Sequence, residues 1–529
     1  MAVLGAQLVI TLLTLSVIQK LSPHFSFAKW LLCATGLYRY LHPSDDELRM
    51  LAGVPKEKHT KGGGGGKGNK SYKTLNGTGQ FHIPRSLEVQ LETTPVVARD
   101  VVNLRYFTEY QWLVDFSAYA AVVYTLSEIY HYYFPLKNEF NLSMIWCLLV
   151  VFFSLKLLSS LTWLYFQNEE SIGERSMVIV ACLVYLLIAM IVLIIDERHL
   201  ETGLEHAYSS FNESASQFLT EQGLPSSGPA SKLIVKLCMA VCCGILGAIF
   251  TFPGLRMAKM HWDSLKYCSG RKILQLILNI SFVLPFLLII LWIRPISREY
   301  LTERVFEGME KPLLSVEAFE TMRLLIVILV VLLRFALIPI YLQSYLNLAH
   351  DKIVDLRKEA GRITNVEYQK KISSIFYYLC VVTLQFAAPL LLCLYLTLMY
   401  KSLGEFTWSG ILKASTSNDS SICIDMCSLD GMSFDLNEED MVDPATAGLP
   451  PVAIISTITL PDSGENVQGD DFNILESANA IHAQWISLKN VFNADVYKGF
   501  LGFASWWSYF TLFTSSALGI VYQSYFSKT

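Results

Sequence analysis

The stretch MRLLIVILVVLLRFALIPIYLQSYLNLAHDKIVDLRKEAGRI, residues 322–363, decides the fold of this chain. Residues 322–346 are apolar and, at about 1.5 Å per residue in a helix, are long enough to cross a hydrocarbon layer of about 30 Å. Arg334 lies in the middle of this apolar run, and beyond Asn347 the pattern changes to that of a charged helix. The stretch therefore predicts a helix that crosses a membrane and continues into water. The continuing part carries a predicted cytosolic contact arm with the basic residues Arg357, Lys358 and Arg362.

The composition of the whole chain is that of a membrane protein. Hydrophobic residues make up 53% of the 529 residues, charged residues make up 16%, and the mean hydropathy is +0.40. This balance predicts an all-α, polytopic transmembrane helical bundle with about eight or nine spans, surrounded by the lipid bilayer. The apolar runs that predict the spans are residues 1–18, 111–134, 142–166, 177–195, 233–252, 273–293, 322–346, 375–400 and 500–526. The formal net charge of −5 gives no sign of a basic surface, so we expect no nucleic-acid partner.

Composition shifts along the chain predict five parts. They are an N-terminal anchor with an interfacial helix (1–41), a flexible Gly/Lys-rich loop (42–105), the main transmembrane bundle (106–400), a polar acidic loop with an amphipathic segment (401–499), and the last transmembrane helix with a short tail (500–529). The Gly/Lys-rich loop is expected to be disordered because it has too few apolar residues to bury. The first apolar run has no basic residue before it, and Lys20 follows it, which favours a retained helix over a cleaved signal peptide.

Orientation is predicted from the loops between the runs. With nine spans, Lys and Arg are more frequent in the set of loops that includes residues 347–374, which places that set in the cytosol. The acceptor sites Asn212 and Asn418 then lie on the other side, where glycosylation occurs. Asn69 and Asn76 are acceptor sites on the cytosolic side, and cleavage of the first run would place them outside instead.

Four charged residues lie at membrane depth: Asp115, Glu128, Lys156 and Arg334. A charge at the centre of a helix costs about 2.5 to 3.5 kcal/mol on insertion scales, so such residues normally face the interior of a bundle and are paired. Counting residues from the turn between the second and third runs brings Asp115 nearer in depth to Lys156 than Glu128. We therefore expect an Asp115–Lys156 pair, with Asp115 and Glu128 as possible counter-ions for Arg334. Such charges either bind helices together or line an ion pathway.

Motifs of enzymes and of metal sites are missing from the sequence. It contains no phosphate-binding Walker loop, no Gly-x-Ser-x-Gly elbow and no His-Glu-x-x-His motif. We therefore expect no catalytic residues, no cofactor and no metal site. Ala240, Gly244 and Ala248 form a ridge of small residues that favours close packing of another helix, within the chain rather than in a dimer.

Several stretches from end to end of the chain resemble the transmembrane protein 161 family, and the B type more than the A type. They are MAVLG (1–5), QLVITLL (7–13), AKWLLC (28–33), HPSDDEL (42–48), EYQWLVDF (109–116), TFPGLR (251–256) and LRKEAGRI (356–363). The resemblance implies a multi-pass membrane protein without known enzymatic activity and, for the B type, control of cardiac rhythm through potassium and calcium currents. The expected function is therefore regulation of membrane excitability at the plasma membrane through ion channels or other membrane proteins. The alternatives are a transporter or channel that uses the intramembrane charges, and residence in the endoplasmic reticulum.

Overall fold

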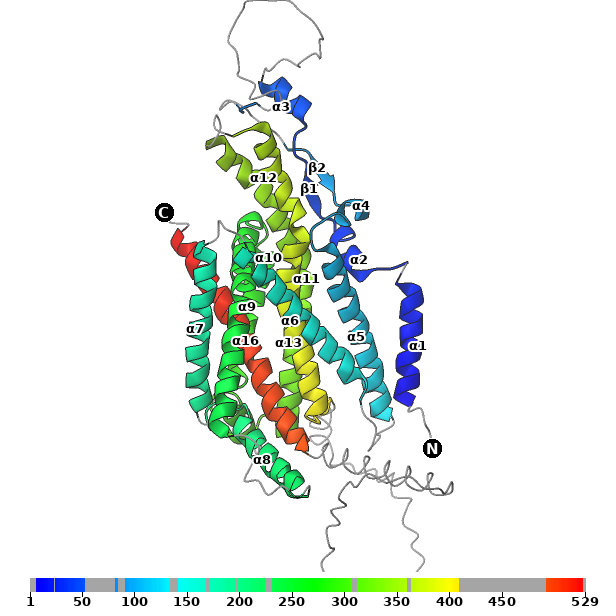
Figure 1. Ribbon diagram of the computed structural model, residues 1–529, viewed down its shortest axis with the longest axis vertical. Coiled ribbons are helices and arrows are strands. Elements are labelled where there is room, and N and C mark those ends of the chain that lie inside the picture. Colours follow the sequence, from blue (N-terminus) through cyan, green and yellow to red (C-terminus); the bar gives the residue numbers. More distant parts are fainter. Residues whose placement is uncertain are drawn as a thin grey trace, which may run out of the picture.

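Helix α11 (Val316–Lys358) runs from one end of the molecule to the other and joins the two regions into which the helices pack (Figure 1). The computed structural model describes residues 6–22, 24–52, 81–83, 91–133, 141–167, 172–195, 197–221, 223, 231–306, 312–358, 363–408 and 491–526. In chain order the elements are α1 (Ala6–Leu21), α2 (Phe27–Cys33), β1 (Tyr38–Tyr40), α3 (Asp45–Ala52), β2 (Thr93–Pro95), α4 (Ala98–Val101), α5 (Phe107–Tyr133), α6 (Ser143–Gln167), α7 (Ile172–Ile194), α8 (Leu204–Glu221), α9 (Lys232–Tyr267), α10 (Lys272–Ile290), η1 (Glu299–Glu303), α11, α12 (Asn365–Tyr377), α13 (Leu379–Leu403) and α16 (Ala494–Phe526).

Among the described residues, six helical segments are long and apolar enough to cross a membrane. They are Ser143–Gln167, Arg175–Ile194, Lys232–Tyr267, Lys272–Ile290, Val316–Leu356 and Asn365–Leu403. Helices α1, α5 and α16 also run along the bundle, but they are shorter or more polar than these six (Figure 1). The predicted all-α membrane bundle is confirmed.

Helix α13 is the centre of the bundle. It packs against α5, α6, α9, α11 and α16, and nearly all of its side chains are buried. A helix that is apolar on every side is buried either in lipid or among other helices, and the contacts of α13 place it among other helices. The bundle is therefore organised around α13, whereas α11 carries the connection to the smaller region.

Small residues allow α9 to lie very close to two neighbours. A Cβ atom added to Gly244 would lie 3.0 Å from the Cβ of Leu186 in α7, and one added to Gly254 would lie 2.1 Å from the Oγ of Ser515 in α16. Ala240 and Ala248, on the ridge with Gly244, are buried. Because the ridge meets α7, the prediction that it packs within the chain is confirmed.

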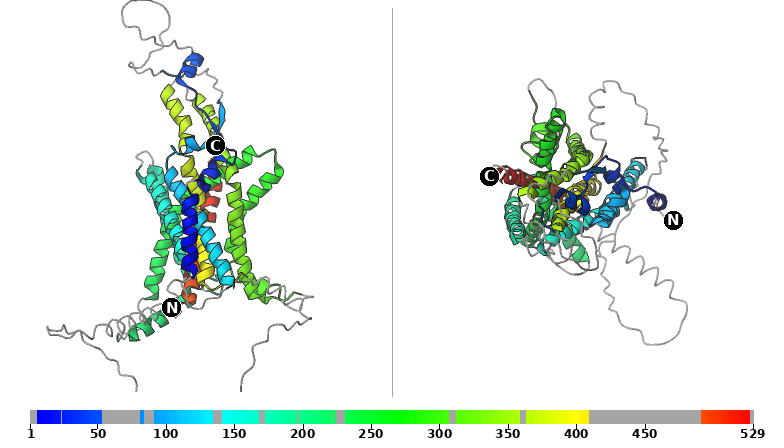
Figure 2. Two further views of the ribbon diagram at one scale, coloured as in Figure 1. Left: turned by 90° about the vertical axis from the view of Figure 1, so that its right-hand side faces the viewer. Right: turned by 90° about the horizontal axis from the view of Figure 1, so that it is seen from above.

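A second, smaller core lies at the α12 end of α11, outside the bundle (Figure 2). Its buried apolar residues are Leu48, Phe81, Ile83, Ile353, Leu356, Ile363, Tyr368 and Ile372. Two capping boxes begin its helices: Ser44 with Glu47 at α3, and Thr364 with Glu367 at α12. We refer to α3, residues 81–83, the part of α11 beyond Asn347, and α12 as the α12 platform.

Part of the platform comes from the segment that the sequence predicts to be a disordered loop. Helix α3 and residues 81–83 are ordered because Leu48 and Phe81 pack on α11 and α12. Asn365 fixes both pieces: its Nδ2 donates to Asp45 at 2.9 Å and its Oδ1 accepts from the backbone N–H of Phe81 at 3.2 Å. This segment has too few apolar residues to fold alone, but α11 and α12 supply the apolar side chains against which its own apolar residues pack. The glycine run 62–66 lies outside the described residues.

The interfacial helix predicted within residues 1–41 corresponds to the short helix α2. Helix α2 ends at Cys33, and Gly36 takes a left-handed backbone conformation (φ 75°) that turns the chain into β1. Strand β1 pairs antiparallel with β2, with Tyr38 opposite Pro95. This strand pair connects the bundle to the platform.

Candidate functional site

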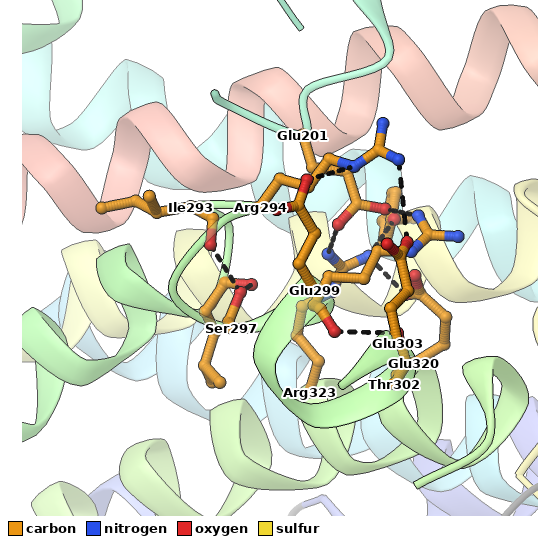
Figure 3. A network of polar contacts seen from close by, with 12 residues as sticks. Glu201, Ile293, Arg294, Ser297, Glu299, Thr302, Glu303, Glu320 and Arg323 are labelled. Carbon is orange, nitrogen blue, oxygen red and sulfur yellow. Dashed lines mark hydrogen bonds and ion pairs between the residues drawn. The ribbon is translucent and has the colours of Figure 1, made fainter. Parts of the chain in front are cut away.

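A network of buried charges lies at the end of the bundle opposite the platform (Figure 3). At its centre is Arg323 of α11, of which only 1% is exposed. Its guanidinium forms an ion pair with Glu320 and donates a hydrogen bond of 2.7 Å to the Tyr400 hydroxyl. It also stacks 4.3 Å from the ring of Trp292. The carboxylate, the hydroxyl and the aromatic face each favour the charged form of this buried guanidinium.

Glu201 extends the network to the segment between α7 and α8. Its carboxylate lies 3.7 Å from Arg323 and forms a second ion pair with Arg298. The Glu201 backbone N–H donates to the carbonyl of Trp292 at 2.9 Å. One residue therefore joins the α7–α8 connection to the ends of both α10 and α11.

The outer part of the network is more exposed. Arg294 lies 3.4 Å from Glu299 and 3.8 Å from Glu303, both in η1 (Figure 3). These side chains are about half exposed, so solvent screens their attraction and each pair contributes little. The buried inner pairs with Arg323 therefore decide how firmly the ends of the helices are held.

Sequence reasoning missed this network because it singled out only charges at membrane depth, and Arg323 and Arg298 lie at or beyond the ends of the apolar runs. A signal was present: Glu320 and Arg323 are three residues apart at the start of the apolar run of α11, a spacing that places them on one helix face. The partner Glu201 gave no such signal, because only the fold brings it near.

A second charged cluster lies on the same end of the bundle, around Glu128 of α5. Glu128 forms an ion pair with Lys401 of α13, and it accepts hydrogen bonds from Ser402 Oγ at 3.0 Å and Trp408 Nε1 at 3.1 Å. The Lys401 ammonium lies 5.3 Å from the Trp408 ring centroid. Three donors satisfy this carboxylate, so it fixes the ends of α5 and α13 to each other.

Asp115 has a different partner from the one that the sequence predicts. Its carboxylate accepts from Ser26 Oγ at 2.7 Å and from the backbone N–H of Ala28 at 2.8 Å, at the first turn of α2. Lys156 of α6 is exposed on the surface of the bundle and forms no ion pair with any described residue. The predicted Asp115–Lys156 pair is wrong, because counting residues gives depth but not the direction in which a side chain points.

Arg334 is buried in the bundle without a carboxylate partner among the described residues. Its Nε donates to the carbonyl of Ser281 at 3.2 Å, and its Nη1 lies 3.0 Å from the sulfur of Met257. Pro285 lacks the N–H that would bond to the Ser281 carbonyl, which lies four residues earlier in α10. Arg334 therefore satisfies a backbone group that the proline leaves free, and Asp115 and Glu128 are not its counter-ions.

The other predicted site residues lie at opposite ends of the molecule. Asn212 is in α8, at the end that holds the Arg323 network (Figure 1). In the platform, Arg357 and Lys358 form the last turn of α11, and Lys358 is exposed and lies 3.4 Å from Asp355. Asn418 and Arg362 lie outside the described residues.

Comparison with known families gives a match over almost the whole chain. Residues 2–527 match the family described as predicted transmembrane protein 161AB. The chain belongs to the transmembrane protein 161 family. The description covers the A and B types together, and it agrees with a membrane protein built from apolar helices. No solved structure matches this member of the transmembrane protein 161 family.

Proposed function

We propose that this chain is a non-enzymatic, multi-pass membrane protein that regulates membrane excitability by contact with ion channels or other membrane proteins. The observation that carries this proposal is the length of α11. Its 43 residues extend about 65 Å at 1.5 Å per residue, about twice the thickness of a hydrocarbon layer. The excess length presents the platform, with its own core, outside the bundle.

The surface of the platform suits a protein contact. Met50 of α3 is 73% exposed, and Val354 of α11 and Val366 of α12 are each more than 40% exposed. The same elements also expose charged side chains of both signs: Lys352, Lys358, Lys370, Asp46, Asp355 and Glu367. Exposed apolar residues on elements that also expose charged side chains are typical of surfaces that bind another protein.

The positions of the intramembrane charges favour a regulator over a transporter. Asp115 binds the start of α2, Glu128 pairs with Lys401, and Arg334 binds backbone carbonyls. Lys156 lies on the outside of α6. A pathway for ions would bring such charges together along one route. Their separate partners instead support a role in holding helices together.

The family resemblance extends the proposal to the B type, to potassium and calcium currents, and to the plasma membrane. We also propose nine spans, with α1, α5 and α16 added to the six apolar segments. The platform then faces the cytosol, and α8 with Asn212 faces the outside.

This orientation predicts which introduced cysteine is labelled from outside the cell. With a membrane-impermeant maleimide on intact cells, Glu213→Cys in α8 should gain label over the wild type, and Lys358→Cys in the platform should gain label only after permeabilisation. Both positions are exposed, so accessibility depends only on the side of the membrane. Labelling of Lys358→Cys on intact cells would contradict the proposed orientation.

The proposed function predicts a specific loss when the platform surface is altered. In cells that express potassium and calcium channels, the wild-type chain should change whole-cell currents, and Val354→Glu with Val366→Glu should remove more than half of that change. Val305→Glu is the matched control, because Val305 is 53% exposed at the opposite end. Surface expression of each variant is measured alongside.

Liposomes that contain only the purified chain test the alternative. The regulator should give no potassium or calcium flux without a channel. A flux that Arg334→Leu abolishes would instead identify a transporter or channel and overturn the proposal.

A further inference from the structure

A cavity of about 590 Å³ lies where the bundle meets the platform. Its walls come from four segments: the turn between α2 and β1, the end of α9, the start of α10, and the middle of α11. Hydrogen bonds join the α2–β1 turn and α9 to α11, and the Tyr38 backbone N–H donates to Gln343 Oε1 at 2.9 Å. Ser264 Oγ donates to Ser344 Oγ at 2.9 Å, and the Tyr267 hydroxyl donates to the carbonyl of Asn347 at 3.2 Å. The cavity is therefore preformed rather than a gap between mobile parts.

One cation of the cavity wall is available to a ligand. Arg271 lines the cavity, is exposed, and forms no ion pair with any described residue. The exposed Lys272 follows it directly. None of the described residues that line the cavity is acidic, and Asp351, outside it, lies 3.4 Å from Lys266. The guanidinium of Arg271 is thus free to form the paired hydrogen bonds with which arginine binds phosphate.

The remaining surroundings indicate the chemistry of the ligand. Gln343 and Asn347 line the cavity at the point where α11 changes from apolar to charged residues, which is the level of lipid head groups. Leu274 of α10 also lines the cavity, and the neighbouring Ile273 (77%) and Leu276 (60%) are exposed apolar side chains of the same helix. A phosphate site at the start of a helix with exposed apolar side chains fits a molecule with a charged head and hydrocarbon chains.

We propose that this cavity binds the head group of an anionic phospholipid, with Arg271 holding the phosphate and the acyl chains lying along α10. Two adjacent cations favour a lipid that carries a second negative group over a zwitterionic lipid. The site does not depend on the proposed action on ion currents, since it is separate from the exposed face of the platform.

Native mass spectrometry of the full chain in detergent tests the site, with dioleoylphosphatidylserine and dioleoylphosphatidylcholine as probes. Phosphatidylserine should bind the wild type more tightly, and Arg271→Gln should weaken it by roughly tenfold, the loss expected for a charge-assisted hydrogen bond. Arg99→Gln is the matched control because it removes the same charge at a different place. Arg99 is exposed in α4 and does not line the cavity. It should leave the dissociation constant unchanged.

A steric variant tests the cavity independently of charge. A Cβ atom added to Gly270 would meet nothing within 4 Å, so Gly270→Trp places a bulky side chain at the cavity wall without a clash at its Cβ atom. It should lower the occupancy of both lipids. Equal binding of the two lipids by the wild type, or unchanged phosphatidylserine binding by Arg271→Gln, would overturn the proposal. Soluble glycerophosphoserine that binds as tightly as the lipid would overturn it in favour of a soluble phosphate ligand.

Discussion

Arg323→Met is expected to destabilise the folded chain by about 3 to 5 kcal/mol, the cost typical of removing one partner from a buried ion pair. The substitution keeps most of the side-chain volume but leaves Glu320 without its cation, and Glu320 is 8% exposed. It also removes the ion pair between the Arg323 guanidinium and the Glu201 carboxylate, which lie 3.7 Å apart. The stacking of the guanidinium on the Trp292 ring is lost as well. We expect a lower midpoint of thermal unfolding in detergent, measured by fluorescence-detected size exclusion.

Two further variants separate the buried pair from a general effect of losing an arginine. Arg304→Met removes an exposed arginine at the same end of the bundle and should change the midpoint little. Glu320→Leu combined with Arg323→Met should recover part of the loss, because no buried carboxylate then lacks its partner. If Arg323→Met were as stable as Arg304→Met, the network would not hold the ends of the helices together.

Apolar runs were sufficient to predict most of the bundle. The run at 322–346 lies inside α11, and the run at 375–400 lies largely in α13. Length and hydropathy are properties of a segment alone, so a sequence reports them directly. The platform could not be predicted in this way. Leu48 and Phe81 are isolated apolar residues in a polar segment, and only their contacts with α11 and α12 give them a core.

The partners of the charged residues could be identified only from the fold. Glu128 was predicted to be at membrane depth as a counter-ion for Arg334, but its cation is Lys401, which is far away in the sequence. Arg334 shows the same limit, since its carbonyl partner is available only because Pro285 interrupts α10 and because α10 lies beside α11. The sequence identified costly charges, whereas the packing of the helices determined what satisfies them.

Gly254→Val is expected to disrupt the packing of α9 on α16. The Cβ atom of any larger residue would lie 2.1 Å from Ser515 Oγ and 2.8 Å from the backbone carbonyl carbon of Ser515. A side chain could rotate away, but backbone atoms cannot, so the two helices must separate. Overpacking in a filled interior typically costs about 1 to 3 kcal/mol, and valine adds more than the Cβ atom alone. We expect most of the variant to elute as aggregate in size exclusion after solubilisation.

Gly270→Ala provides the control for this prediction, because its added methyl group meets no atom within 4 Å and should leave the chain monodisperse. Ser515→Gly combined with Gly254→Ala should recover part of the packing, since it removes the Oγ and Cβ atoms that lie closest. The recovery should remain incomplete because the backbone contact at 2.8 Å persists. Full stability of Gly254→Val would mean that α9 and α16 are not packed this closely. Gly254 belongs to the stretch TFPGLR, so the close approach of α9 and α16 explains in physical terms why a glycine occupies that position.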